Sequence, residues 1–525
     1  MSIELSDSVS RLNEEIVDLW TRYGSSGEYE MQPFVPTEEN ISDIEKRLTQ
    51  LESSLQNCCG QNPLDDITLL HIENRVEVLS FRLKDDLAFP FRYVTSLNGS
   101  INNLLFMDVR EPQRRVDVLN ARLEGAEEVL RETVRKTEAV GMDRREMTSE
   151  YLGSLADVLD SIGESLSESD IPDETEGIEQ LKQAAEEIGE IAQSLLHRID
   201  DMAKPRCPVK PLPYNQRLRE VWGIELEELV SWYEEEVEKS QQRFRSIAAE
   251  IDPDKSPNKL LNEELPSCDQ PEDMFPLMEG FVKQARAESL SYITLPEGEE
   301  CEVWPVPEQL KDSYPWGGYS GPDSLLDNLK GAVFLNDYNY EAVTLGWMKM
   351  MAIHECYPGH HAHRVKTINS PLPDCFKLGH LMSRGGPLTE GIAHRSETLM
   401  QHIFSEKAFE LFVAYRRMHT AVRVMAELYL HHLDRSVEEV ISLYQKYLEF
   451  SHDAARGQVH FQKLWPGYMT IYYYGQKYLA ELEEQLDWDE ADFTELIFSI
   501  GYGGLPVLEE VIDLSEEVRQ RMLWG

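Results

Sequence analysis

The stretch from residue 351 to residue 364, MAIHECYPGHHAHR, contains the side chains best suited to chemistry. His354 and Glu355 are placed as at the start of an H-E-x-x-H motif. In that motif, two histidines one helical turn apart bind zinc and the glutamate acts on the water beside it. The second histidine would stand at position 358, but this residue is Pro358. The stretch is therefore a damaged metal site, a metal site of another form, or a histidine-rich surface.

The residues before the stretch predict a helix that carries His354 on its apolar face. Val343, Trp347 and Met350 precede it at helical spacing. A lone histidine on such a face is usually a core residue with a hydrogen-bond partner. Glu355 next to it changes this expectation, because a buried carboxylate requires a compensating partner and a divalent cation is one.

The same helix should end or kink at Pro358. Proline lacks a backbone N–H, and Gly359 allows the chain to leave the helical conformation. If the chain folds back over the helix end, His360 or His361 supplies the imidazole that position 358 lacks. A tight turn favours His360, and the sequence leaves both open.

A third metal ligand is expected from the segment GGPLTEGIAHRSETLMQHIF. Glu390, His394 and Glu397 are spaced four and three residues apart, on one face of the helix that should follow the Gly-Gly-Pro break. Alone, such a face is more typical of a solvated stripe. After a histidine–glutamate helix, it favours a site with two histidines, one glutamate and an open position for water, as in hydrolytic zinc enzymes.

Several neighbouring side chains are candidates for outer roles. The candidates for orienting ligands or contacting substrate are His361, His394, Glu397 and Arg395. Three arginines near the motifs could hold a terminal carboxylate of a substrate or form ordinary salt bridges: Arg364, Arg384 and Arg395.

Composition excludes some classes of partner. The net charge of −46 disfavours nucleic acids and anionic membranes, because binding phosphates requires a dominant basic surface. No run of 18 apolar residues is present and the N-terminus lacks the pattern of a secretory signal. The 7 cysteines have no zinc-ribbon or redox spacing. We expect a reduced, cytoplasmic protein.

The hydrophobic pattern predicts a mainly α fold in two regions. Residues 1–204 carry apolar residues at helical spacing among many acidic ones, and form an acidic helical region. Prolines at 205, 208, 211 and 213 interrupt this pattern. Residues 205–525 form a second helical region, metal-binding and hydrolase-like, with a cleft and a small β-ribbon near 300–336.

These motifs resemble a known family. HECYPGHH resembles the H-E-x-x-P-G-H signature of the domain of unknown function 885, mostly helical proteins regarded as zinc metallopeptidases. LTEGIAHRSE resembles its E-G-W-A-x-x-x-E segment, and PGYMTIYYYGQKYL its P-G-x-x-x-x-Y-x-x-G block. The resemblance covers roughly residues 210–520. The chain departs from the family pattern at Ile392, where tryptophan is usual, and at His363, where glutamine is common.

The resemblance implies a set of roles. His354, His360 and Glu390 correspond to the ligands of one Zn²⁺ per chain, Glu355 to the catalytic base, and Tyr472 to a hydroxyl near the substrate. A packing role for Tyr472, within the run IYYYG, is equally consistent with the sequence.

The function favoured by the sequence is that of a zinc-dependent hydrolase, a metallopeptidase or carboxypeptidase that uses metal-activated water and a glutamate base. The expected substrate is a peptide or a small amide. Two alternatives are a zinc amidase or esterase acting on a small metabolite, and a non-catalytic helical binding protein. The joint presence of the histidine–glutamate pair, the glutamate-bearing helix and the late tyrosine disfavours the last.

Overall fold

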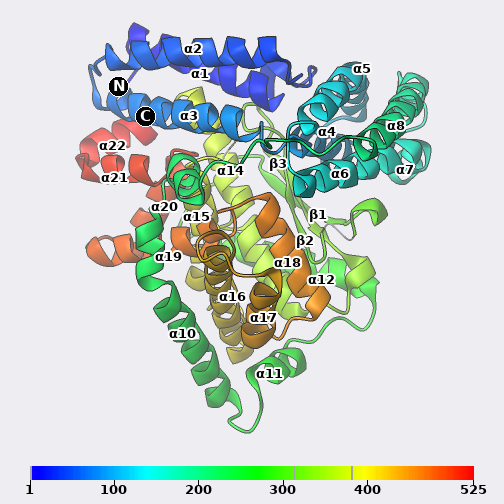
Figure 1. Cartoon of the computed structure of the whole chain (residues 1–525). Helices are drawn as coiled ribbons and strands as arrows, with labels where there is room; N and C mark the ends of the chain where they lie inside the picture. Colours follow the sequence, from blue (N-terminus) through cyan, green and yellow to red (C-terminus); the bar gives the residue numbers. More distant parts are fainter. Residues whose placement is uncertain (1–2, 312–313, 380–381, 525) are drawn as a thin grey trace.

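Helices dominate the computed structural model, which describes residues 3–311, 314–379 and 382–524. The prediction of a mainly α chain with one small β element near residues 300–336 is confirmed. Figure 1 shows a layer made by the first three helices, a group of helices from α4 to α8, and a larger helical body that includes the sheet and the C-terminal half.

The N-terminal helices divide between two hydrophobic cores. Side chains of α1–α3 pack with those of the C-terminal half, whereas α4–α8 build a second core with a few residues from 306–334. The two regions predicted to meet near residue 204 stay a prediction. The change from one hydrophobic core to the other lies between α3 and α4. The helices are α1 (Asp7–Gly24), α2 (Glu38–Gln56), α3 (Pro63–Asp85), α4 (Phe91–Asn102), α5 (Pro112–Thr137), α6 (Met142–Asp160), α7 (Ile162–Glu168) and α8 (Ile178–Asp200).

The proline-rich segment leads into the second half without forming a helix. Residues 201–213 are extended or bent, because four closely spaced prolines prevent a regular helix. Val209 forms an isolated parallel bridge with Val140, which ties this segment to the corner between α5 and α6. The next helices are α9 (Tyr214–Arg217), α10 (Leu226–Ile251), α11 (Pro257–Glu264) and α12 (Met274–Ser289).

The β element is a three-stranded mixed sheet, which refines the predicted ribbon. Its strands are β1 (Glu300–Pro305), β2 (Gly317–Ser320) and β3 (Lys330–Leu335), in the order β1–β3–β2. β1 is parallel to β3 and β2 is antiparallel to it. Alternate residues of β3 enter different cores: Ala332 and Phe334 pack with the second, Val333 and Leu335 with the first. The sheet therefore joins the two cores.

The C-terminal half surrounds one deeply buried helix. Every residue of α15 from Gly386 to Glu397 is buried, including its charged ones. The helices are α13 (Leu345–Met351), α14 (His360–Ile368), α15 (Gly386–Leu399), α16 (Lys407–His431), α17 (Val437–Leu448), α18 (His452–Leu464), α19 (Thr470–Gln485), α20 (Glu490–Ser499), α21 (Leu505–Asp513) and α22 (Glu516–Leu523). Short 3-10 or π segments are η1 (Gly27–Tyr29), η2 (Asn103–Met107), η3 (Leu218–Trp222), η4 (Pro271–Asp273), η5 (Glu308–Leu310), η6 (Asp337–Asn339), η7 (Ala352–Cys356) and η8 (Asp374–Lys377).

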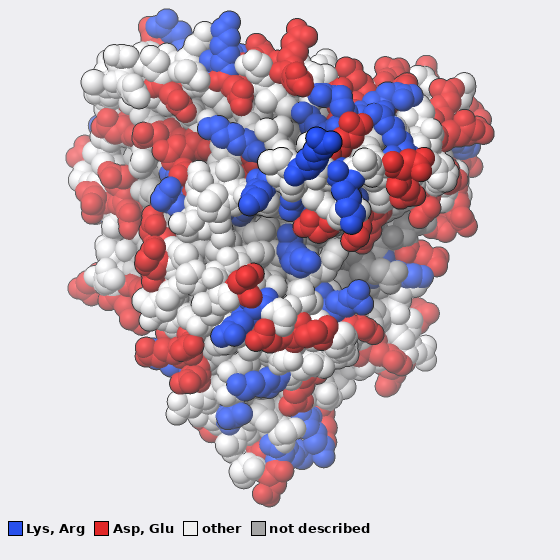
Figure 2. Space-filling model, viewed as in Figure 1, with Lys and Arg blue, Asp and Glu red and all other residues white. Residues whose placement is uncertain are grey.

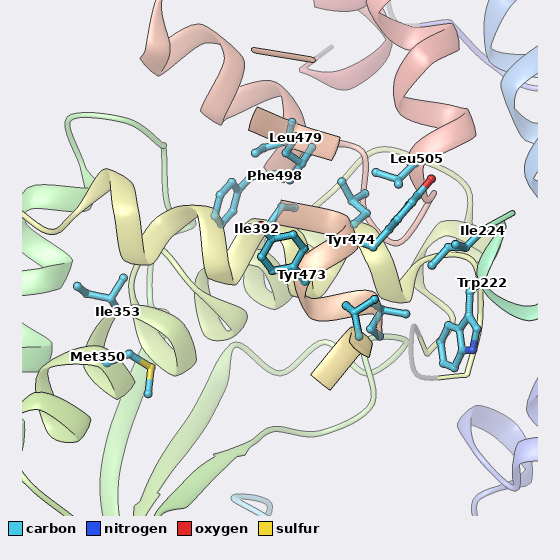
Figure 3. Packing of buried hydrophobic residues seen from close by; sticks show 14 of the residues in the cluster. Trp222, Ile224, Met350, Ile353, Ile392, Tyr473, Tyr474, Leu479, Phe498 and Leu505 are labelled. Atoms are coloured by element: carbon cyan, nitrogen blue, oxygen red, sulfur yellow. The ribbon is translucent and has the colours of Figure 1, made fainter. Parts of the chain in front are cut away.

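Helices α15 and α19 cross with their backbones in contact. A Cβ atom on Gly391 would lie 2.6 Å from the carbonyl carbon of Gly475, and one on Gly475 would lie 1.8 Å from the carbonyl oxygen of Pro387. Figure 3 shows Ile392 beside this crossing, among side chains of α19 and α20 that include Tyr473. The two glycines thus set the distance between the helices that carry Glu390 and Tyr472.

The acidic composition is visible on the surface. Figure 2 shows Asp and Glu spread over the visible face, with Lys and Arg more frequent toward the upper centre, where α6 and α18 approach each other. Within the described ranges, no helix is both long and apolar enough to cross a membrane.

Replacing Gly391 with alanine should lower the free energy of unfolding by about 2 kcal/mol, because the new methyl group overlaps the backbone of α19. Gly153→Ala on α6 is the matched control, since a Cβ there meets nothing within 4 Å and alanine favours a helix by about 1 kcal/mol. Denaturant midpoints of both variants test this. Equal midpoints for Gly391→Ala and the unmodified protein would contradict a tight crossing.

Candidate metal centre

The histidine-rich stretch forms a helix end, a turn and a new helix start. The Thr344 side chain caps α13 by accepting a hydrogen bond from the Trp347 amide. The helix continues into the π segment η7 and leaves helical geometry at Tyr357. After a cis peptide bond to Pro358, α14 begins at His360. The prediction that the helix ends at the Pro-Gly pair is confirmed.

Gly359 allows this turn to fold back onto the helix end. A Cβ atom at this position would lie 1.8 Å from the carbonyl oxygen of His354, so a larger residue does not fit. Ser396 on α15 donates a hydrogen bond of 2.8 Å to the Pro358 carbonyl and holds the turn from the other side. As a result, the rings of His354 and His360 lie 4.8 Å apart, centre to centre.

Three ligand-type atoms converge at this turn. Glu390 Oε2 lies 3.7 Å from His354 Nε2 and 3.6 Å from His360 Nε2. Two atoms that bind one tetrahedral zinc at about 2.1 Å lie about 3.4 Å apart, so these separations fit. Glu390 Oε2 is buried and has no hydrogen-bond partner among the described residues. An orphaned buried carboxylate oxygen between two imidazoles is what a missing cation would leave.

Glu355 lies beside the same two histidines and lines the same cleft. It offers an oxygen within 4.8 Å of the ligand atoms of His354 and His360. It is half-buried, whereas His354 is buried. Glu355 is therefore within reach of a water molecule bound to an ion that the two histidines would hold.

Without a metal, the site is held by charge. Burial acts to lower the pKa of His360, but the carboxylate of Glu390 outweighs it and raises this pKa to about 9. Burial acts to raise the pKa of Glu390, and His360 with its neighbours instead brings it down to about 2. Burial lowers the pKa of His354, which leaves that ring neutral. An imidazolium thus occupies the role of the cation.

A second carboxylate on α15 orients His354. Glu397 Oε1 lies 2.8 Å from His354 Nδ1, and a carboxylate only accepts hydrogen bonds, so Nδ1 carries the proton. The lone pair of Nε2 is then free to face Glu390 and His360. This carboxylate–histidine arrangement is the usual outer support of metal-binding histidines. Glu397 also contacts His394 Nδ1 at 3.2 Å and Arg416 Nη2 at 3.3 Å.

His354, His394 and Glu397 form a second cluster that could hold an ion. Its contacts of 2.8 and 3.2 Å match hydrogen bonds, and the shorter one is well below the roughly 3.4 Å expected between two zinc ligands. Burial acts to raise the pKa of Glu397, but His394 and Arg416 lower it well below its usual value. These charges already satisfy Glu397, so the cluster with Glu390 is the better metal centre.

The two histidines left open by the sequence lie in different places. His360 faces Glu390, whereas His361 lies 3.0 Å from Glu299 through Nε2 and 3.1 Å from the Tyr319 hydroxyl through Nδ1. His361 is fully buried there and forms part of the packing below the sheet. The structure therefore brings His360, and not His361, to the candidate centre.

The arginines suggested by the sequence are engaged elsewhere. Arg395 binds Glu483 through two nitrogens and Thr494 through a third, away from the cleft. Arg384 pairs with Glu77 and Asn74. Arg364 reaches the cleft wall, but its three nitrogens donate to backbone carbonyls of residues 322, 328 and 330. None of the three is placed to receive a substrate carboxylate.

The centre opens into a cleft of about 350 Å³. Besides the centre itself, its wall includes Trp316, Trp347, Met350, Arg416, Arg423 and Tyr472. Tyr472 packs its ring 5.6 Å from the ring of His394. Burial, followed by the charge of Glu390, raises the pKa of Tyr472 well above its usual value, so its hydroxyl keeps a proton to donate.

Arg416 and Arg423 of α16 were missed by the sequence analysis. Their spacing of seven residues, two turns on one helical face, was the available signal. It was weak, because arginines on a long helix usually face solvent and nothing in the sequence tied α16 to the motifs.

Comparison with known families now places the chain. The model of the family described as "Bacterial protein of unknown function (DUF885)" matches residues 26–512. The chain belongs to this family. The match confirms the family that the sequence suggested and extends it to residue 26, over helices α2–α8. No curated protein shows significant similarity to the DUF885 chain.

Two solved structures share the fold. Both are described as a "putative lipoprotein". That of Colwellia psychrerythraea has a TM-score of 0.74 at 16% identity, covering 95% of this chain and 98% of the other. That of Shewanella oneidensis has a TM-score of 0.70 at 15% identity, covering 97% and 100%. At this identity the likeness establishes the fold alone, and the cytoplasmic location expected for this DUF885 chain stays a prediction.

The two adjacent histidines offer a direct test of the metal ligands. The DUF885 protein supplied with zinc should hold about one ion per chain, as should His361→Asn, whereas His360→Asn should hold much less, because only His360 faces Glu390. Elemental analysis of the purified folded proteins measures this. Retention by His360→Asn together with loss by His361→Asn would overturn the placement.

Zinc uptake should depend on pH through His360. Near pH 7.5 its imidazole is protonated in the metal-free protein, because its pKa is about 9, whereas Glu390 is already ionised and His354 already neutral. A ligand must lose its proton, so binding releases about one proton and tightens about tenfold per pH unit from pH 7 to 8.5. Calorimetry in two buffers of different ionisation enthalpy measures the proton count. Affinity independent of pH would contradict the ion pair.

Proposed function

We propose that this protein is a zinc-dependent hydrolase that cleaves peptide bonds in short peptides. The observation that carries the proposal is the convergence of His354 Nε2, His360 Nε2 and the orphaned Glu390 Oε2, with Glu355 beside the same two histidines. Two histidines and one glutamate with an open position are the donor set of hydrolytic zinc sites.

The three donor atoms are of types that zinc binds, and one of the histidines is held in orientation by a neighbouring carboxylate. Imidazole nitrogens and one carboxylate oxygen are ligands that zinc accepts, and the hydrogen bond from His354 Nδ1 to Glu397 fixes the ring that presents Nε2. Zinc held by these three side chains would supply Lewis acidity, lowering the pKa of water and polarising a carbonyl group.

The remaining steps belong to the chain's own residues. Glu355 would take the proton of the attacking water and deliver it to the leaving amine, a role supported by its place beside His354 and His360. Tyr472 keeps its hydroxyl proton and lines the same cleft, and it would donate a hydrogen bond to the oxygen on which negative charge develops. Its ring contacts with His394 and Tyr468 hold it in this position.

The shape of the cleft favours small substrates. A volume of about 350 Å³ is at the lower end for ligand sites, which span about 300–1,000 Å³. The stacked indoles of Trp316 and Trp347, with ring centres 4.8 Å apart, form an apolar wall for one substrate side chain. A small amide or ester of a metabolite would also fit this space, and a substrate screen separates the two.

Glu355→Gln should keep its zinc and lose at least about a hundredfold in kcat on a pool of short peptides, because the amide cannot accept the water's proton. Glu341→Gln, at an exposed position before α13, is the matched control and should stay fully active. Amine release and metal content are measured on both variants. Full activity of zinc-loaded Glu355→Gln would refute the assigned role, and hydrolysis only of small amides would establish the alternative substrate class.

A further inference from the structure

Helix α16 presents two buried arginines to the metal cleft. Arg416 and Arg423 are two turns apart, about 10 Å along the helix axis, and are only 6% and 8% exposed. Both line the same cleft as His354, His360 and Glu390. Two buried cations are unexpected beside a site that would itself hold a divalent cation. Each of these arginines therefore needs a negatively charged partner.

Arg416 has such a counter-charge. Its Nη2 lies 3.3 Å from Glu397 Oε1, and its guanidinium lies 5.0 Å from the centre of the Trp347 ring. The charge of Arg416 is thus used in holding the carboxylate that orients His354. This residue belongs to the support of the metal centre.

Arg423 has no carboxylate of its own among the described residues. Its Nε donates to the neutral amide oxygen of Gln458 at 3.1 Å, and its guanidinium lies 5.4 Å from the centre of the Tyr472 ring. Glu390 acts to raise the pKa of Arg423, but this carboxylate is already paired with His360. Burial is the main influence on Arg423 and lowers its pKa.

A buried guanidinium that faces a cleft without an anion is poorly compensated. Its terminal nitrogens are in a fork that matches a carboxylate, which binds such a group by two parallel hydrogen bonds. The anion that would neutralise the guanidinium of Arg423 is therefore best supplied by a ligand bound in the cleft. The net charge of −46 on the whole chain gives no long-range attraction for such a ligand, so recognition depends on this local cation.

We propose that Arg423 binds the terminal carboxylate of a peptide whose last peptide bond lies at the His354–His360–Glu390 centre. This inference rests on the proposed function and narrows it to removal of one residue from the carboxyl end. Tyr472 contacts Arg423 and also His394, whose ring lies 4.7 Å from that of His354. One residue spans only about 3.6 Å, so the carboxylate receptor must share the small cleft with the centre, as Arg423 does.

The reaction balances with water as the only co-substrate. The C–N bond of the last peptide link breaks and a C–O bond forms from the water oxygen. Glu355 carries one water proton to the departing nitrogen, and the products are a free amino acid and a peptide one residue shorter. The free amino acid retains the carboxylate held by Arg423.

The kinetic test compares two pools of N-acetylated dipeptides, one ending in free carboxylates and the other in carboxamides. Zinc-loaded wild-type protein should hydrolyse the acids with a kcat/KM about tenfold or more above that for the amides. Arg423→Gln should remove this preference and keep the zinc content within about twofold, while Arg423→Lys should keep part of the preference. Arg417→Gln, a neighbour on α16 outside the cleft, should keep it whole.

A binding test requires neither catalytic turnover nor knowledge of which substrate side chains the cleft prefers. Succinate carries two carboxylates, one for the centre and one for Arg423, and succinamate lacks one of them. Calorimetry on zinc-loaded protein should give at least about tenfold tighter binding of succinate, and Arg423→Gln should abolish the difference. The unfolding temperature of each variant, measured beforehand, confirms that it is folded.

The outcomes separate this inference from the proposed function. Zinc binding and peptide hydrolysis without any preference for free carboxylates or for succinate would overturn the role of Arg423 and leave the hydrolase intact. Failure of the wild-type protein to bind zinc or to cleave any peptide would overturn the proposed function and this inference with it.

Discussion

Two carboxylates, Glu390 and Glu397, are buried on one face of α15, and the surrounding structure supplies what that burial requires. Each would be unstable in the interior without partners, since an isolated buried charge is far costlier than a paired one. Glu397 is satisfied by His354, His394 and Arg416. Glu390 Oε2 lies 3.7 Å from His354 Nε2 and 3.6 Å from His360 Nε2, and it has no hydrogen-bond partner among the described residues. This difference makes Glu390 the better candidate for a metal ligand and Glu397 the better candidate for its support.

The positions of these acids depend on backbone contacts at either end of the site. At Gly391 and Gly475 two helices meet without side chains between them, so α15 and α19 cannot shift apart without losing buried contact. At Gly359 the turn after η7 lies directly on the His354 carbonyl, and Ser396 of α15 holds it there. A centre that requires ligand atoms within a few tenths of an ångström is thus built on rigid elements.

The cleft combines this centre with a local positive charge inside an acidic protein. Arg416 serves the centre through Glu397, whereas Arg423 faces the cavity with a neutral partner. The sheet contributes to the wall of the cleft through β2, one of its two edge strands, and both faces of β3 are packed into separate cores. The N-terminal helices contribute to the same framework, since α1–α3 share their core with the C-terminal half.

The sequence by itself determined what local chemistry can determine. Helical spacing predicted the mainly α class, Pro358 and Gly359 predicted the end of the helix that carries His354, and the spacing of Glu390, His394 and Glu397 placed them on one helical face. These follow from interactions within a few residues, which spacing and backbone preference encode directly. The motif resemblance gave the family, and the zinc ligands and hydrolase activity it implied stay predictions.

Only the tertiary structure decided how separate elements meet. The choice of His360 over His361 depended on the tightness of a turn set by contact with α15, and no spacing within residues 351–364 contains that information. The same holds for Glu397 as the partner of His354, for Arg423 in the cleft, and for the parallel pairing of β1 with β3. Each arises from packing between segments far apart in the chain. A sequence pattern shows which face of an element is buried, and only the packed structure shows what that face is buried against.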